Sequence, residues 1–108
     1  MSEPESAIEA IALEIDDRAE TVADVERSTA EAATVFARSG QAFAVVHSDG
    51  FDFRLGPTIG SAALRTPDVT PASRGRDWVR FSPAGLDEYA LDRALAWFDA
   101  AWRRAASG

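Results

Sequence analysis

Four polar side chains in the second half of the chain have the chemistry to bind an anion together. Arg74 and Arg76 flank a glycine in a short basic loop beside Ser73, and Arg80 follows in a segment with strand-like alternation. Guanidinium groups and a serine hydroxyl are donors that suit a phosphate or a carboxylate. Alternatively, these arginines pair with Asp68, Asp77 or the acidic first helix. The residues alone leave both interpretations open.

A second group lies near the C-terminus, where Tyr89, Arg93 and Trp97 follow one another at a spacing of four residues. On a helix this spacing forms a continuous strip beside the main apolar stripe. The strip could be an exposed interaction patch, covered by a second copy in a two-fold homodimer, with Arg93 between the two rings. Alternatively, both aromatic side chains widen the buried face of the helix.

The chain has few of the residue types that carry acid–base or nucleophilic catalysis. The chain has no cysteine and no lysine, since all 11 basic residues are arginine, and His47 is its single histidine. Asp49 and Asp52 lie near His47, but one imidazole with two carboxylates would hold a divalent ion only weakly. We expect His47 to be a structural residue at the end of a hairpin, and we predict no catalytic residue, no metal site and no cofactor.

Length and charge narrow the class of protein. A chain of 108 residues with 46% hydrophobic residues predicts one globular domain over residues 1–108. The net charge is −7, with 12 acidic and 4 basic side chains in residues 1–54 against 6 and 7 in residues 55–108. Binding to nucleic acid is therefore the least expected function. The absence of a long apolar run and of a secretory pattern predicts a cytoplasmic protein with no membrane contact.

An antiparallel meander is predicted between Arg27 and Leu55, with turns at residues 39–40 and 48–50. A two-residue turn at Ser39-Gly40 pairs Phe36 with Phe43. A three-residue loop at residues 48–50 pairs Val45 with Phe53, whereas a two-residue Asp49-Gly50 loop splits the aromatic residues between the two faces. The first register is favoured because it gathers large apolar groups on one face. That face collects Phe36, Phe43, Val45, Phe51, Phe53 and Leu55, and the other Val35, Ala37, Ala44, Val46, Asp52 and Arg54.

Helices are predicted at both ends of the chain. Residues 6–15 carry isoleucines on one helical face, with a capping-box spacing between Ser6 and Glu9, and the helix is expected to end at residues 17–20. Residues 22–28 either extend this helix or form an edge strand, and we favour the strand. The C-terminal helix spans residues 86–106, and its apolar stripe is expected to lie across the aromatic face of the sheet. The stripe consists of Leu91, Leu95, Phe98, Trp102 and Ala105.

Shorter elements connect the meander to this last helix. A short helix is predicted at residues 57–65, and two prolines hold residues 66–71 extended. Residues 77–81 then form a strand with Val79 and Phe81 on one face. The fold class is α+β: a mostly antiparallel sheet of four to five strands, both terminal helices on one face, in the order α-(β)βββ-α-β-α.

This order of elements, with residues 40–44, 59–64, 77–81 and 95–102, resembles the small MmcQ/YjbR-like family. It is also similar to short bacterial domains called luciferase-family proteins, which are not luciferases. The resemblance implies an α+β fold and transfers no catalytic residue. The lysines usual in YjbR-like central strands are absent, and Arg54 stands where one is expected.

The sequence predicts a non-enzymatic binding or protein-interaction module. The alternative is a site for a small anionic ligand, a phosphate or a carboxylate, at Ser73, Arg74, Arg76 and Arg80.

Overall fold

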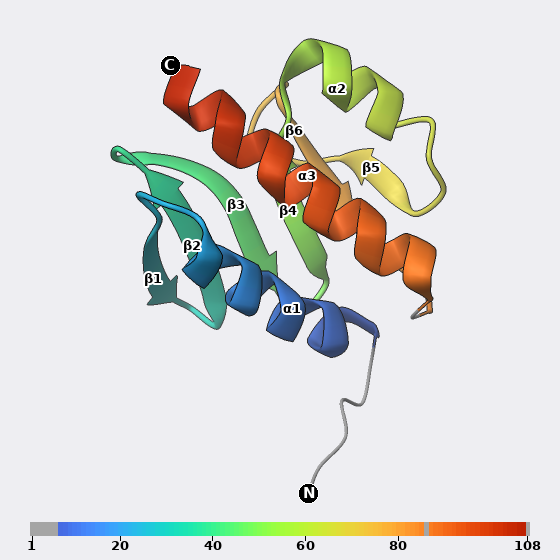
Figure 1. Cartoon of the computed structure of the whole chain (residues 1–108). Coiled ribbons are helices and arrows are strands. Elements are labelled where there is room, and N and C mark those ends of the chain that lie inside the picture. Colours follow the sequence, from blue (N-terminus) through green and yellow to red (C-terminus); the bar gives the residue numbers. More distant parts are fainter. Residues whose placement is uncertain (1–6, 86, 108) are drawn as a thin grey trace, which may run out of the picture.

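A six-stranded antiparallel sheet and three helices make up the fold (Figure 1). The computed structural model describes residues 7–85 and 87–107, so the predicted roles of Ser6 and Leu86 at helix starts lie outside the described residues. The strands lie in the order β1-β2-β3-β4-β6-β5. The elements are α1 (Ala7–Thr21), β1 (Glu26–Ala30), β2 (Ala33–Arg38), β3 (Gln41–His47), β4 (Gly50–Arg54), α2 (Gly56–Ala63), β5 (Val69–Pro71), β6 (Trp78–Phe81) and α3 (Glu88–Ser107).

The predicted α+β class is confirmed, and so is the edge strand at β1. The predicted number of strands was too low, because the extended proline segment pairs with β6 as the edge strand β5. Pro71 is tolerated there because an edge strand needs hydrogen bonds on one side only. No helix in residues 7–85 and 87–107 is both long enough and apolar enough to cross a membrane.

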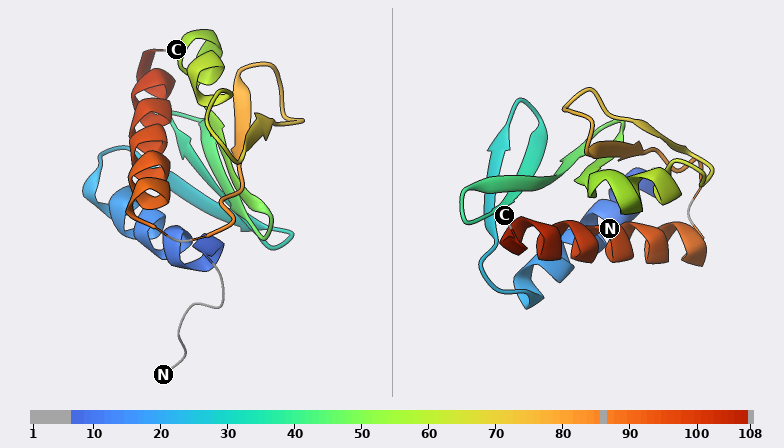
Figure 2. Two further views of the ribbon diagram at one scale, coloured as in Figure 1. Left: turned by 90° about the vertical axis from the view of Figure 1, so that its right-hand side faces the viewer. Right: turned by 90° about the horizontal axis from the view of Figure 1, so that it is seen from above.

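All three helices lie on one face of the sheet (Figure 2). The core between the sheet and α3 is aromatic: the ring of Phe98 meets those of Phe36 and Phe43 edge-on, with centroids 5.4 and 5.3 Å apart. Trp97 packs edge-on against Phe81 at 5.2 Å. These rings supply most of the large buried side chains, and edge-to-face contacts stabilise the core beyond burial alone.

The apolar stripe of α3 is rotated from the predicted one. Phe98 is buried as expected, but Leu91, Leu95 and Trp102 are only half-buried. Leu95 lines a cavity with residues of α1, and the Trp102 indole donates to the Ala23 carbonyl at 2.8 Å. Small side chains on α3 let the helix approach a sheet whose own phenylalanines fill the space. The buried line consists of Ala90, Ala94, Phe98, Ala101 and Ala105.

A β-bulge in β3 changes the predicted register. The turn at Ser39-Gly40 has two residues with positive φ, and it pairs Arg38 with Gln41 as predicted. Beyond a register shift, however, Phe36 pairs with Ala44 instead of Phe43. The extra residue keeps Phe43 in the core while moving the following residues by one position. Ala44 and Val46 therefore pack with the core cluster, and Val45 pairs with Asp52 on the opposite face.

The turn between β3 and β4 is also shorter than predicted, because His47 pairs with Gly50 and only Ser48 and Asp49 lie between them. Gly50 has a φ of +144° and is buried against the backbone carbonyl of Phe81, where a Cβ would collide. Glycine is therefore required at this position both for the close approach to β6 and for the positive φ at the end of the turn. Neither predicted loop, of residues 48–50 or 49–50, is the observed one.

Candidate functional site

Asp52 is fully buried on the face of the sheet that no described helix covers. Its neighbours Phe51 and Phe53 point into the core, so the alternation of β4 places the carboxylate on the other side. Asp52 lies opposite Arg80 in the β4–β6 ladder, which brings an arginine directly beside it. We call this side of the sheet the open face.

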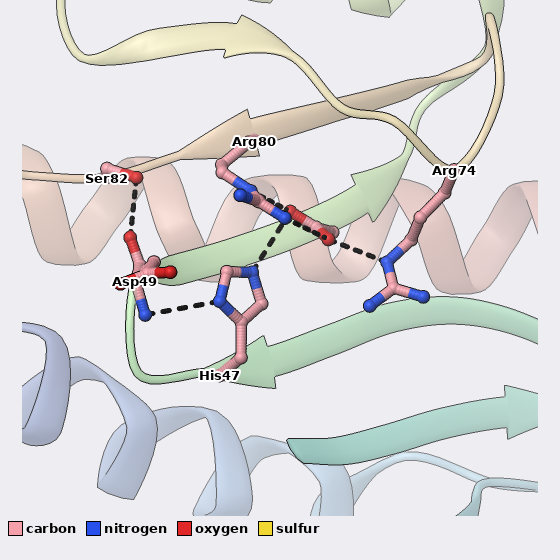
Figure 3. A network of polar contacts seen from close by, with 6 residues as sticks. His47, Asp49, Arg74, Arg80 and Ser82 are labelled. Atoms are coloured by element: carbon pink, nitrogen blue, oxygen red, sulfur yellow. Dashed lines mark hydrogen bonds and ion pairs between the residues drawn. The ribbon is translucent and has the colours of Figure 1, made fainter. Parts of the chain in front are cut away.

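Two arginines and one histidine converge on this carboxylate (Figure 3). Arg80 donates from Nε to Oδ1 at 2.9 Å and from Nη2 to Oδ2 at 3.3 Å. Arg74 reaches in from the β5–β6 loop and donates from Nε to Oδ2 at 2.7 Å. A buried carboxylate is tolerated because these hydrogen bonds replace the water that it has lost.

His47 completes the cluster and has both ring nitrogens engaged. Its Nδ1 accepts the backbone N–H of Asp49 at 3.2 Å, and its Nε2 lies 3.3 Å from Asp52 Oδ1. Since Nδ1 is an acceptor, the neutral ring carries its proton on Nε2 and donates it to the carboxylate. The Ser82 hydroxyl donates to the carbonyl of Asp49 at 2.7 Å and so ties this turn to the end of β6. The arrangement fixes the histidine and leaves it no free nitrogen to act as a base.

The electrostatics follow from these contacts. Burial by itself raises the pKa of Asp52, but the hydrogen bonds from Arg80, Arg74 and His47 outweigh it, and the pKa lies below its ordinary value. The hydrogen bond to Asp52 raises the pKa of Arg80, to which the charge of nearby Asp49 also contributes. Asp52 and Arg80 are therefore charged at neutral pH.

Arg74 is the arginine of this cluster with the most donors still available. Its side chain is 40% exposed, and its single hydrogen bond to Asp52 uses Nε, which leaves both Nη groups for other acceptors. The ring of Trp78 lies 5.9 Å from the Arg74 guanidinium carbon and flanks it on the open face. The site thus presents a positioned guanidinium at the protein surface.

The structure brings together two of the four predicted ligand-binding residues, Arg74 and Arg80. Ser73 and Arg76 are exposed in the same loop, and neither touches Asp52. The proposed pairing of Arg74 and Arg80 with Asp68, Asp77 or α1 is wrong, because their shared partner is Asp52. The sequence analysis named Asp52 only as a carboxylate near His47 and missed it as the partner of Arg74 and Arg80. The signal was a single carboxylate between two phenylalanines in a strand.

The predicted strip on α3 is divided by the fold. Trp97 packs against Phe53 and Phe81, so it widens the core as the alternative interpretation held. Arg93 lies over the ring of Phe81 at 5.8 Å, and its Nε is buried without a hydrogen-bond partner. Only Tyr89 is well exposed, at 65%.

Comparisons with known proteins leave the site to be interpreted from its chemistry. No protein-family model matches the chain, no curated protein matches its sequence, and no solved structure matches it. The resemblance to YjbR-like proteins therefore stays a prediction. Within the described residues, no group of three histidine, aspartate or glutamate side chains is placed to hold a metal ion.

Proposed function

We propose that this protein is a non-enzymatic binding module whose open face binds the anionic group of a small ligand, a phosphate or a carboxylate. The observation that carries the proposal is the geometry of Arg74. Asp52 holds this side chain by Nε alone, so its two Nη groups form a fork directed away from the buried carboxylate. A fork of this kind donates hydrogen bonds to two oxygens of one anion.

Local charge supports an anion of modest size. Arg74 and Arg80 together carry two positive charges against the single negative charge of Asp52, which gives the cluster a charge of +1 in a protein of net charge −7. A single phosphate or carboxylate needs only this local surplus, whereas a polyanion would also meet the acidic remainder of the surface. The proposal therefore ranks nucleic acid last.

Binding in place of catalysis is supported by the state of the titratable groups. Asp52 accepts hydrogen bonds from two arginines, and both nitrogens of His47 take part in hydrogen bonds. General acid–base catalysis needs a group that can exchange a proton with the substrate within hydrogen-bond reach. In this cluster the carboxylate and imidazole position the arginines, and the arginines contact the ligand.

The test is a titration with inorganic phosphate and with acetate, followed by backbone amide NMR shifts and by thermal unfolding. Saturable shifts around residues 73–80 are expected, and a ligand at about 100 times its Kd adds about 2.7 kcal/mol of stability. Arg74→Gln should remove the effect. The matched control is Arg65→Gln, because Arg65 is an exposed arginine outside the open face, directly after α2.

Two results would overturn the proposal. One is the absence of saturable shifts with either anion at low ionic strength. The other is binding that survives Arg74→Gln while that variant remains folded. Retention of the wild type on single-stranded DNA at low salt, lost in Arg74→Gln, would instead favour the nucleic-acid interpretation.

A further inference from the structure

A second cavity lies on the opposite side of the sheet, between α2 and the C-terminal half of α3. Its volume is about 280 Å³, and it opens to solvent. Three apolar and two cationic residues line it: Leu55, Ile59, Ala100, Arg103 and Arg104.

The apolar side of the cavity includes side chains that remain exposed to solvent. Leu55 is buried at the start of α2, but Ile59, one turn later, is 41% exposed. Ala100 is half-buried on the facing side of α3. A large exposed aliphatic side chain across a cavity from a small one provides a surface on which an apolar group would be removed from water.

The side chain of Arg104 lies beside this cavity and packs against the start of α2. Its guanidinium lies over the backbone of Gly56, where an added Cβ would come within 2.5 Å of Nη1. The φ of Gly56 is +82°, so glycine serves both the backbone conformation and the close approach. The Arg104 guanidinium therefore packs on the backbone at the start of α2.

The donors of Arg104 are only partly used within the described residues. Nη2 meets Asp77 Oδ2 at 3.4 Å, which is long for a charge-assisted hydrogen bond, and Nε is buried without a partner. Arg103 adds a second positive charge to the same cavity. Two guanidinium groups beside an aliphatic wall match a ligand that has a charged end and an apolar end.

We infer that this cavity binds a small amphiphilic anion, a medium-chain carboxylate, with its charged group at Arg103 and Arg104 and its chain against Leu55, Ile59 and Ala100. Octanoate represents this class of ligand and serves as the probe. The site is independent of the open face, because α2 and α3 lie on the other side of the sheet (Figure 2). Failure of one proposal therefore leaves the other standing.

The experiment titrates the full chain with octanoate, below the concentration at which it forms micelles, and follows amide shifts by NMR. Butyrate provides the charge with little chain, and octanol provides the chain without the charge. Octanoate is expected to bind at least about tenfold more tightly than either, because each comparison removes one half of the contacts. The shifts should centre on Leu55, Ile59 and Ala100.

Two variants test the site from different sides. Arg103→Gln removes an exposed charge and should weaken octanoate binding about tenfold, while Ala100→Phe fills the cavity and should abolish binding. Arg65→Gln, with the same loss of charge outside the cavity, should bind as the wild type does. The amide spectrum of each variant shows that it is folded.

Three results would overturn the inference. One is the absence of a saturable shift with octanoate, or shifts centred on Arg74 and Arg80 in place of this cavity. Equal affinity for octanoate, butyrate and octanol would show that binding does not depend on both a charged end and an apolar chain. Unchanged binding in folded Arg103→Gln and Ala100→Phe would show that the ligand lies elsewhere.

Discussion

The two faces of the sheet are built on opposite physical principles. The face under the helices buries six phenylalanines in all, five from the strands and Phe98 from α3, while the open face buries one carboxylate under two arginines and a histidine. On the helix face, the hydrophobic stabilisation has no directional requirement and depends on how well the side chains fill the core. Burial on the open face depends on a few directional hydrogen bonds from two arginines and a histidine, which must all be in place.

The two kinds of burial differ in what they leave available to a ligand. Aromatic contacts satisfied inside the molecule leave nothing for a ligand, whereas an arginine fixed by one of its donors still presents the others to solvent. Strand β4 serves both faces, because Phe51 and Phe53 point one way and Asp52 the other. A change in one of these side chains should therefore affect one face and spare the other.

The largest effect is expected from Phe98→Ala, which removes the ring packed against Phe36 and Phe43. We expect a loss of about 3–5 kcal/mol in the free energy of unfolding, measured by urea denaturation. Leu13→Ala is the control, because Leu13 is 61% exposed and its truncation should change stability by no more than about 0.5 kcal/mol. Equal losses for both variants would contradict the packing of α3 on the aromatic face.

A smaller loss is expected from Arg80→Met, which keeps the aliphatic stem but removes two of the hydrogen bonds to buried Asp52. Removing one partner of a buried pair costs about 3–5 kcal/mol, and partial exposure of Arg80 places the loss near 3 kcal/mol. Arg65→Met is the matched control. If both variants unfold at the same urea concentration, the cluster on the open face adds nothing to stability.

The open face should also make stability sensitive to acid. Because the pKa of Asp52 is lowered by folding, its contribution is fully present above the ordinary value of 3.8 and is lost as the pH falls through the lower native pKa. Asp52→Asn should be less stable than the wild type at pH 7 by about 1–3 kcal/mol. The gap should close below pH 3.8. Urea midpoints that differ by a constant amount from pH 7 down to pH 2 would contradict this prediction.

The smallest effect on stability is expected at Tyr89, which is exposed on the first turn of α3. Tyr89→Glu should change the free energy of unfolding by no more than about 0.5 kcal/mol. It also tests the predicted homodimer, which stays a prediction, without disturbing Trp97 in the core. Sedimentation of a dimeric wild type beside a monomeric variant would support that dimer, and a wild-type monomer at high concentration would end it.

The sequence by itself determined the class and order of the elements. Alternation predicted the strands around Phe36, Phe43 and Val79, and Ser39-Gly40 predicted the turn that joins β2 to β3. The apolar stripe at helical spacing predicted the last helix. In the structure, Asp87 Oδ1 accepts the Ala90 N–H at 2.7 Å at the start of that helix. These features depend on residues close together in the chain, and local rules describe such residues well.

Only the tertiary structure decided how these elements meet. The bulge beside Phe36 and the two-residue turn after His47 arise because several phenylalanines must fill one core together, which no single strand specifies. The same register moves Val45 to the open face, where the sequence had already placed Asp52. The pairs Arg74–Asp52 and Arg80–Asp52 join residues 22 and 28 positions apart, and Arg104 reaches Asp77 across 27. Contacts at such separations depend on the packed fold, so the sequence could indicate the arginines but not the carboxylate that positions them.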